Sequence, residues 1–330
     1  MPLRTRVLFI AAFETPFILD DLRFLESRFE VVPMIGSGPV QVGRISARVA
    51  SADVIFSWFA SVYAAVAVLA GASLGKRTIL QVGGVDLASE PDLGYGIWTS
   101  GWRSRMVGQA IRSATRVLAV DESLQEEAKL RARYDGRNIE VLPTGFDPER
   151  WKPGPEKERR VVCVASVPDE ARIRIKGLDV LLEAARKLPD VKFTVVGVRG
   201  ELISGLRAPS NVEILPWMMQ ESVRTHLERA AVCCQPSRRE GLPNALCEAM
   251  LCECIPVATA VGGNPRAVGN TGLLVEPGDT DALARALTMA LGMPRDHGRA
   301  ARFHIMERFS RTRREDRLAT LIEHGPGASR

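Results

Sequence analysis

The chain has 330 residues, about twice the length of one ordinary domain, and 46% of them are hydrophobic and 25% charged, so two globular domains are expected. This apolar content excludes a disordered chain, and a net charge of +5 without any long Lys/Arg block does not favour a nucleic-acid-binding protein. The basic excess lies after Arg150, because residues 1–150 hold 17 basic and 17 acidic side chains, and it suits a small anionic ligand.

The first half alternates short apolar runs with helical patterns. RVLFIAA is followed by a helix at 15–28, and FEVVPMI, DVIFSW, RTILQV, a helix at 102–114 and RVLAV continue the series. The alternation predicts an α/β fold with a mostly parallel, doubly wound sheet. The uncharged stretch 54–75 is long enough to cross a bilayer, yet it divides into a strand-like and a helix-like part. We expect a buried β-α-β passage there, with a membrane span as the alternative.

The pattern restarts after FDPERWKPGPEKERR, where three prolines and dense charge cannot continue a strand or helix. VVCVAS, a helix at 178–187, VKFTVVG, NVEIL, a helix at 220–229 and AVCCQPS follow. We therefore expect domains at 1–146 and 159–310, joined by a linker at 147–158. Ligands of doubly wound sheets bind beyond the carboxyl ends of the strands, so we expect the two domains to face a central cleft.

All six cysteines lie in the second half, without a CxxC pair or a His at zinc-ligand spacing. They are interpreted as reduced packing residues, which favours a cytoplasmic protein without a metal site. The apolar run after Arg4 and Arg6 is too short for a signal peptide. At the C-terminus, Leu318, Leu321 and Ile322 form an apolar stripe on a helix rich in arginine. Those arginines either form a solvated face or contact an anionic membrane, which would make the protein peripheral at the inner face of the membrane.

The segment 235–279 carries the densest chemistry. Glu240 follows a buried strand, and Glu248 lies inside the helix that begins near Asn244. Two carboxylates in this frame can accept hydrogen bonds from the vicinal hydroxyls of a polyol, and the N–H groups of the first helical turn can hold a sugar or a phosphate. A simpler interpretation makes Glu248 a helix-surface acid and Glu240 a partner of the helix dipole.

Five blocks in this order resemble one known family. They are EGLPNALCEAM, IPVATAVGGNPRAV, TGLLVEPGD, KGLDVLLEAARKL with VKFTVVG, and VLPTGFDPERWKP. The chain is similar to the family 4 nucleotide-sugar-dependent glycosyltransferases, which are retaining enzymes with the GT-B arrangement of two Rossmann-like domains. The resemblance implies transfer of a sugar from a nucleoside diphosphate sugar to a hydroxyl of a glycan, lipid or small molecule. It also implies no cofactor besides the donor, no metal, and a C-terminal helix at 311–330 that crosses back to the N-terminal domain.

The resemblance further implies roles for single residues. Glu248 would bind the ribose hydroxyls, Glu240 would meet the donor sugar, and Lys176 would bind the diphosphate. A Lys beside a helix N-terminus also suits this last role physically, because both favour negative charge. The expected donor site is completed by Gly241, Leu242, Asn244 and Ala245.

The chain departs from the family where an arginine usually follows the first strand of the second domain. That slot reads Ala165-Ser166-Val167, so the loop that follows would have to supply the arginine. Arg172 and Arg174 are the candidates, and Arg172 is favoured because RIRIK would place both on the face of Lys176 if the segment were extended. The frequent histidine of the first domain is also missing, since all four histidines lie in the second half.

On the first-domain side, QVGGVDLASE is the best candidate for the acceptor site. Gly83 and Gly84 would let backbone approach a ligand, and Asp86 would bond a hydroxyl, unless it only caps a structural turn. Ser57, Trp58 and Phe59 would line the same pocket, although an interior aromatic pair is the favoured interpretation.

Two other functions remain open. A sugar-nucleotide epimerase of the same fold would need acid-base residues, and the absence of a histidine from the first domain counts against it. A non-catalytic nucleotide-sugar-binding subunit is compatible with the altered arginine slot. A nicotinamide dehydrogenase is not favoured, because the first strand runs into AAFETPF rather than G-x-G-x-x-G.

Overall fold

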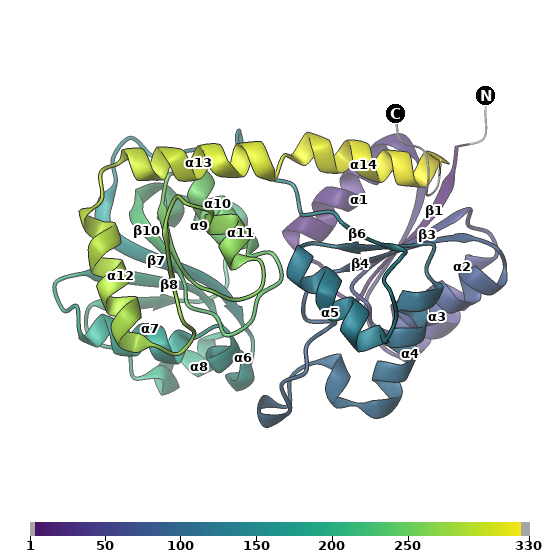
Figure 1. The fold of residues 1–330 in the computed structure, drawn as a ribbon, viewed down its shortest axis with the longest axis horizontal. Coiled ribbons are helices and arrows are strands. Elements are labelled where there is room, and N and C mark those ends of the chain that lie inside the picture. Colours follow the sequence, from purple (N-terminus) through teal and green to yellow (C-terminus); the bar gives the residue numbers. More distant parts are fainter. Residues whose placement is uncertain (1–3, 325–330) are drawn as a thin grey trace. The chain divides into compact units, whose positions relative to one another are not determined.

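The computed structural model describes residues 4–324, which divide into two compact units. Among these residues, the first unit combines 4–145 with 311–324, and the second contains 146–310. Each unit holds one six-stranded sheet in which the paired strands are all parallel, with helices in the connections (Figure 1). The α/β prediction with two doubly wound sheets is confirmed.

In the first unit the strand order is β2-β1-β3-β4-β5-β6, so the chain changes direction across the sheet between β1 and β3. The strands are β1 (Arg6–Ala11), β2 (Glu30–Ile35), β3 (Val54–Trp58), β4 (Arg77–Val82), β5 (Arg116–Ala119) and β6 (Ile139–Val141). The helices are α1 (Pro16–Arg28), α2 (Pro39–Val49), α3 (Val62–Ser73), α4 (Gly101–Ser113), α5 (Glu122–Ala132) and α14 (Arg311–His324).

The uncharged stretch 54–75 folds as the β-α-β passage that its pattern predicts. Every residue of β3 is buried, and the side chain of Ser61 accepts a hydrogen bond from the Ala64 N–H at the start of α3. That cap and the alanine-rich sequence explain a helix that packs closely in the core. Across residues 4–324, no helix is both long enough and apolar enough to span a membrane.

Helix α14 belongs to the first unit, where it contacts α1 (Figure 1). Leu318, Leu321 and Ile322 are buried, as the apolar stripe predicts. The interpretation of the C-terminal arginines as a solvated face is wrong for Arg314, which is 4% exposed and donates to Asp21. The sequence pattern gave no sign of this, since the partner lies 293 positions away.

The second unit has the strand order β12-β11-β10-β7-β8-β9. Its strands are β7 (Glu158–Val167), β8 (Lys192–Val198), β9 (Val212–Leu215), β10 (Ala230–Gln235), β11 (Ile255–Thr259) and β12 (Leu273–Val275). Its helices are α6 (Glu170–Ile175), α7 (Leu178–Arg186), α8 (Gly200–Ile203), α9 (Gln220–Arg229), α10 (Asn244–Leu251), α11 (Asn264–Val268), α12 (Thr280–Gly292) and α13 (Asp296–Arg308).

The stretch 147–158, expected to be a linker, packs on the second unit. Trp151 is 3% exposed, and the Arg302 guanidinium donates to the carbonyls of Pro148 and Trp151. The prolines prevent regular structure here, but the guanidinium satisfies the carbonyls that a helix or sheet would otherwise pair.

All six cysteines are free and buried. Burial raises the pKa of the Cys163 thiol to about 12, with Lys176 lowering it and Glu240 raising it to a smaller extent. The thiolate is the reactive form, so we expect none of the six thiols to react with a thiol reagent at pH 8 until the chain is denatured. Titration with a chromogenic disulfide, with and without guanidinium chloride, measures this. Rapid reaction of even one thiol in the native chain would contradict the buried placement.

Candidate active site

The switch point of the second sheet lies between β7 and β10, which are neighbours although β8 and β9 intervene in sequence. Loops that leave the carboxyl ends of such a strand pair form the usual ligand site of a doubly wound sheet. After β7 the chain passes through the short helix α6 to Lys176, and after β10 it turns at Pro236 and reaches Glu240. The topology therefore brings the two principal residues of the sequence analysis to one edge.

Lys176 and Glu240 form an ion pair at this edge. The Lys176 Nζ lies 2.7 Å from Glu240 Oε1, and the two side chains are 21% and 8% exposed. Gln235 Nε2 and Ser237 Oγ each donate to the same Oε1 at 2.7 Å. Glu240 is thus held through one carboxylate oxygen by three donors, which defines its orientation.

Two glycines allow the loops of the site to approach one another. Gly177 has φ +65°, and a Cβ there would lie 2.0 Å from the carbonyl oxygen of Pro236. Gly262, after β11, has φ +52°, and a Cβ would lie 2.0 Å from the carbonyl oxygen of Glu240. Since only glycine fits both the conformation and the space, the glycine of the KG pair and the first glycine of the GG pair have a structural explanation.

Glu248 lies half-buried on α10, about one helical turn beyond the helix start at Asn244. Its Oε1 accepts a hydrogen bond of 3.3 Å from Gln220 Nε2, at the beginning of α9. The Gln220 amide oxygen in turn accepts from the Arg150 guanidinium. Glu248 is therefore tied to two other segments of the second unit and is not a simple surface acid.

The remaining predicted donor-site residues lie between these two carboxylates in sequence. Gly241 and Leu242 are buried, and Gly241 accepts a backbone hydrogen bond of 2.8 Å from the Gly263 N–H. Asn244 and Ala245 are the first two residues of α10 and are half-buried. The start of α10 is a place where helical N–H groups and the helix dipole favour an anion or a sugar oxygen.

The predicted common face of Arg172, Arg174 and Lys176 is wrong. The segment is the helix α6, begun by Asp169, whose carboxylate accepts from the Arg172 N–H at 2.9 Å. Side chains two positions apart in a helix point about 200° away from one another around the helix axis. Arg174 is accordingly exposed while Arg172 is half-buried, so alternation does not favour Arg172 as the diphosphate ligand.

In the first unit, the expected acceptor-side group has a structural role instead. Asp86 is completely buried, and its carboxylate accepts from the N–H groups of Ala60, Gly83 and Gly84. The expectation that Asp86 offers its carboxylate to a hydroxyl is therefore corrected, and the structural cap is the interpretation that holds. Burial raises the pKa of Asp86, while these hydrogen bonds act in the opposite direction.

Gly83 also has a different neighbour from the one expected. A Cβ on Gly83 would lie 2.5 Å from the ring of Phe59, so the space beside this glycine is taken by the aromatic side chain. Phe59 has φ +63° and is 7% exposed, and Trp58 is 1% exposed. The interior aromatic pair is confirmed.

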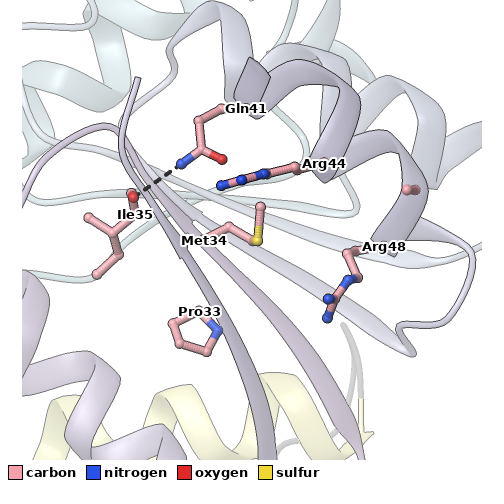
Figure 2. A pocket seen from close by; sticks show the side chains of 7 residues that line it. Pro33, Met34, Ile35, Gln41, Arg44 and Arg48 are labelled. Atoms are coloured by element: carbon pink, nitrogen blue, oxygen red, sulfur yellow. Dashed lines mark hydrogen bonds between the residues drawn. The ribbon is translucent and has the colours of Figure 1, made fainter. Parts of the chain in front are cut away.

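A separate pocket of about 530 Å³ lies in the first unit between β2 and α2 (Figure 2). Arg44 and Arg48 of α2 lie beside it, and Gln41 donates to the carbonyl of Ile35 at 3.2 Å. None of the predicted site residues lines this pocket.

No group of three or more His, Cys, Asp or Glu side chains among residues 4–324 is placed to hold a metal ion.

The sequence patterns do not single out the polar residues that surround the two glutamates. Gln235 and Ser237 stand in the quoted run AVCCQPS, where a glutamine that ends an apolar strand was a usable signal. Gln220 and Arg150 carried no such signal, because only the folded chain brings them to Glu248.

Comparison with known proteins gives a consistent result. Residues 158–292 match the family described as Glycosyl transferases group 1. A protein of Bacillus subtilis (strain 168), named as the teichuronic acid biosynthesis glycosyltransferase TuaC, is 29% identical over 245 residues, covering 72% of this chain and 60% of its own length. A D-inositol 3-phosphate glycosyltransferase of Mycobacterium sp. (strain JLS) is 32% identical over 211 residues, covering 57% of this chain and 47% of its own. The chain thus spans about half to three-fifths of these relatives.

Two solved structures share the fold over nearly the whole chain. Anabaena Alr3699/HepE, solved in complex with UDP, has a TM-score of 0.76 at 17% identity and covers 96% of this chain and 99% of its own. The sucrose-phosphate synthase of Thermosynechococcus elongatus has a TM-score of 0.78 at 17% identity, with coverage of 96% and 98%. At this identity the likeness concerns the fold, which is the GT-B type of two α/β domains.

Proposed function

We propose that this chain, whose residues 158–292 match the group 1 glycosyl transferases, moves a sugar from a nucleoside diphosphate sugar to an acceptor hydroxyl with retention of anomeric configuration. The observation that carries the proposal is the Lys176–Glu240 ion pair at the switch point of the second sheet. A cation and a carboxylate at one sheet edge are the two groups that a sugar diphosphate needs, because one end of it is anionic and the other is a polyol.

In the proposed donor complex, Lys176 and the N-terminus of α7 bind the diphosphate. Both favour negative charge, so they stabilise the nucleoside diphosphate as it leaves the sugar. Glu240 accepts hydrogen bonds from hydroxyls of the donor sugar, and Glu248 accepts them from the ribose. The first unit is proposed to bind the acceptor, whether a glycan, a lipid or a small molecule.

The first experiment is a thermal-shift screen with UDP, GDP and ADP and their sugars. A ligand that binds the native chain stabilises it by RT ln(1 + [L]/Kd), about 2.7 kcal/mol at 100 times Kd. UDP-sugars are the first to test, because the Anabaena protein that shares the fold was solved with UDP. We expect one base to raise the melting temperature clearly more than the other two.

Turnover with the selected donor then distinguishes the functions. NMR of the product with a panel of acceptors is expected to show a new glycosidic bond with the donor's anomeric configuration. An inverted product would reject retention. A new sugar nucleotide formed without acceptor would indicate an epimerase, and donor binding without turnover across the panel would indicate a non-catalytic subunit.

A further inference from the structure

Gln235 is the last residue of β10, and its side-chain amide donates a hydrogen bond to Glu240. It is 3% exposed on a strand whose neighbouring residues, Cys233 and Cys234, are completely buried. A strand in the middle of a parallel sheet, covered on both faces, is ordinarily apolar throughout. The polar amide at this position therefore needs an explanation.

The amide of Gln235 can face only one way. Its Nε2 donates to Glu240 Oε1 at 2.7 Å and to Ser237 Oγ at 3.0 Å, which uses both of its N–H bonds. The Ser237 hydroxyl in turn donates a hydrogen bond to Glu240 Oε1. If the amide were flipped, its oxygen would face a carboxylate oxygen and a hydroxyl already committed as a donor, so the observed orientation is imposed by Glu240.

This orientation leaves the Gln235 amide oxygen buried and without a hydrogen-bond partner among residues 4–324. A buried unpaired acceptor destabilises a fold, and native proteins retain few of them. Gln235 has such an unpaired acceptor, and in this orientation both of its N–H groups donate to Glu240 and Ser237. Every hydrogen bond described for Glu240 falls on Oε1, so Oε2 is the oxygen presented for a ligand.

We propose that Gln235 is a positioning residue that, with Ser237, holds Glu240 Oε1 and thereby aims Oε2 at the donor sugar. The inference rests on the proposed function. Lys176 is the third donor to Oε1, and in the donor complex its ammonium also faces the diphosphate. Gln235 and Ser237 keep the carboxylate in place when Lys176 redirects part of its hydrogen bonding to the phosphates.

Two substitutions test this, with Thr194→Val as a matched control. Thr194 is equally buried in the second sheet and bonds Arg160, near the amino ends of β7 and β8. Gln235→Leu keeps the volume and removes both N–H bonds, and it is expected to lower kcat about tenfold or more with UDP affinity changed less than about threefold. Thr194→Val is expected to shift the melting temperature similarly and to leave kcat unchanged.

Gln235→Glu supplies a readout that a purely structural role would not change. Two adjacent carboxylates repel each other unless they share a proton, and a protonated carboxyl can donate as the amide does. The kcat of this variant relative to wild type is therefore expected to rise as the pH is lowered, whereas the relative kcat of Gln235→Leu stays flat.

Calorimetric titration with UDP separates this inference from the proposed function. A wild-type chain that neither binds a nucleoside diphosphate nor turns over a sugar nucleotide would overturn both. The positioning role alone is overturned if wild type binds and reacts while Gln235→Leu keeps its kcat within about twofold, loses UDP affinity in parallel with kcat, or shares the pH dependence of Gln235→Glu.

Discussion

Replacing Lys176 by alanine is expected to lower the rate of sugar transfer by about 10²–10³-fold while the chain remains folded. Lys176 donates to Glu240 and lies next to Gly177 at the start of α7, and in the proposed donor complex it also binds the diphosphate. Its loss removes a positive charge where the leaving group becomes more negative. Steady-state kinetics with the donor selected by thermal shift measures the effect, and circular dichroism checks the fold.

The matched control is Lys187→Ala. Lys187 lies at the other end of α7, is 47% exposed and pairs with Asp281 on the surface, so its removal should leave kcat/KM unchanged. Glu240→Ala is expected to abolish transfer. Full activity in either Lys176→Ala or Glu240→Ala would overturn the assignment of the site.

Lys176→Arg makes the prediction more specific. Arginine keeps the charge but replaces a compact ammonium by a planar guanidinium, and the two are not equivalent at a site with fixed geometry. Since three donors already converge on Glu240 Oε1, we expect only partial activity in this variant. Activity equal to wild type would show that charge alone matters and that the observed geometry does not.

The sequence predicted those features that depend on local pattern and on motif order. Alternating apolar runs gave both parallel sheets, and the topology then placed Lys176 and Glu240 at one edge because parallel strands that flank a switch point end together. The glycine pairs of the motifs were visible as well, and their reason became clear from the close backbone approaches at Gly177 and Gly262.

What could not be predicted depends on contacts between distant segments or on a misjudged period. RIRIK alternates like a strand, but Asp169 caps it as a helix, and the face argument for Arg172 failed. Asp86 looked like a ligand group because it follows a strand, yet the N–H groups that it satisfies include Ala60, 26 positions away. The distant contact of Asp86 cannot be read from a single stretch of sequence, whereas the Asp169 cap lies only three residues before Arg172 and was a usable signal.

Arg314→Met is expected to destabilise the first unit by about 3–5 kcal/mol, the largest stability effect we predict. The guanidinium uses all five of its N–H bonds, two on Asp21 and one each on Gln81 Oε1 and the carbonyls of Leu142 and Pro143. Methionine keeps the unbranched stem of the side chain but lacks the guanidinium, so these buried acceptors lose their donor. Calorimetry of the full chain measures the effect, because the transition that the nucleoside diphosphate selected by thermal shift does not stabilise is assigned to the first unit.

The cause of that loss can be tested by changing the partner. Asp21 also accepts from Trp58 Nε1 at 2.8 Å, so Asn at position 21 removes the charge and keeps an acceptor for the indole. If the cost of Arg314→Met comes mainly from an uncompensated buried carboxylate, adding Asp21→Asn should recover a large part of it. Arg317→Met is the control, because its pair with Glu140 is partly exposed and should contribute about 1 kcal/mol or less. Equal effects of Arg314→Met and Arg317→Met would contradict the buried network, and with it the anchoring of α14 on the first unit through Asp21.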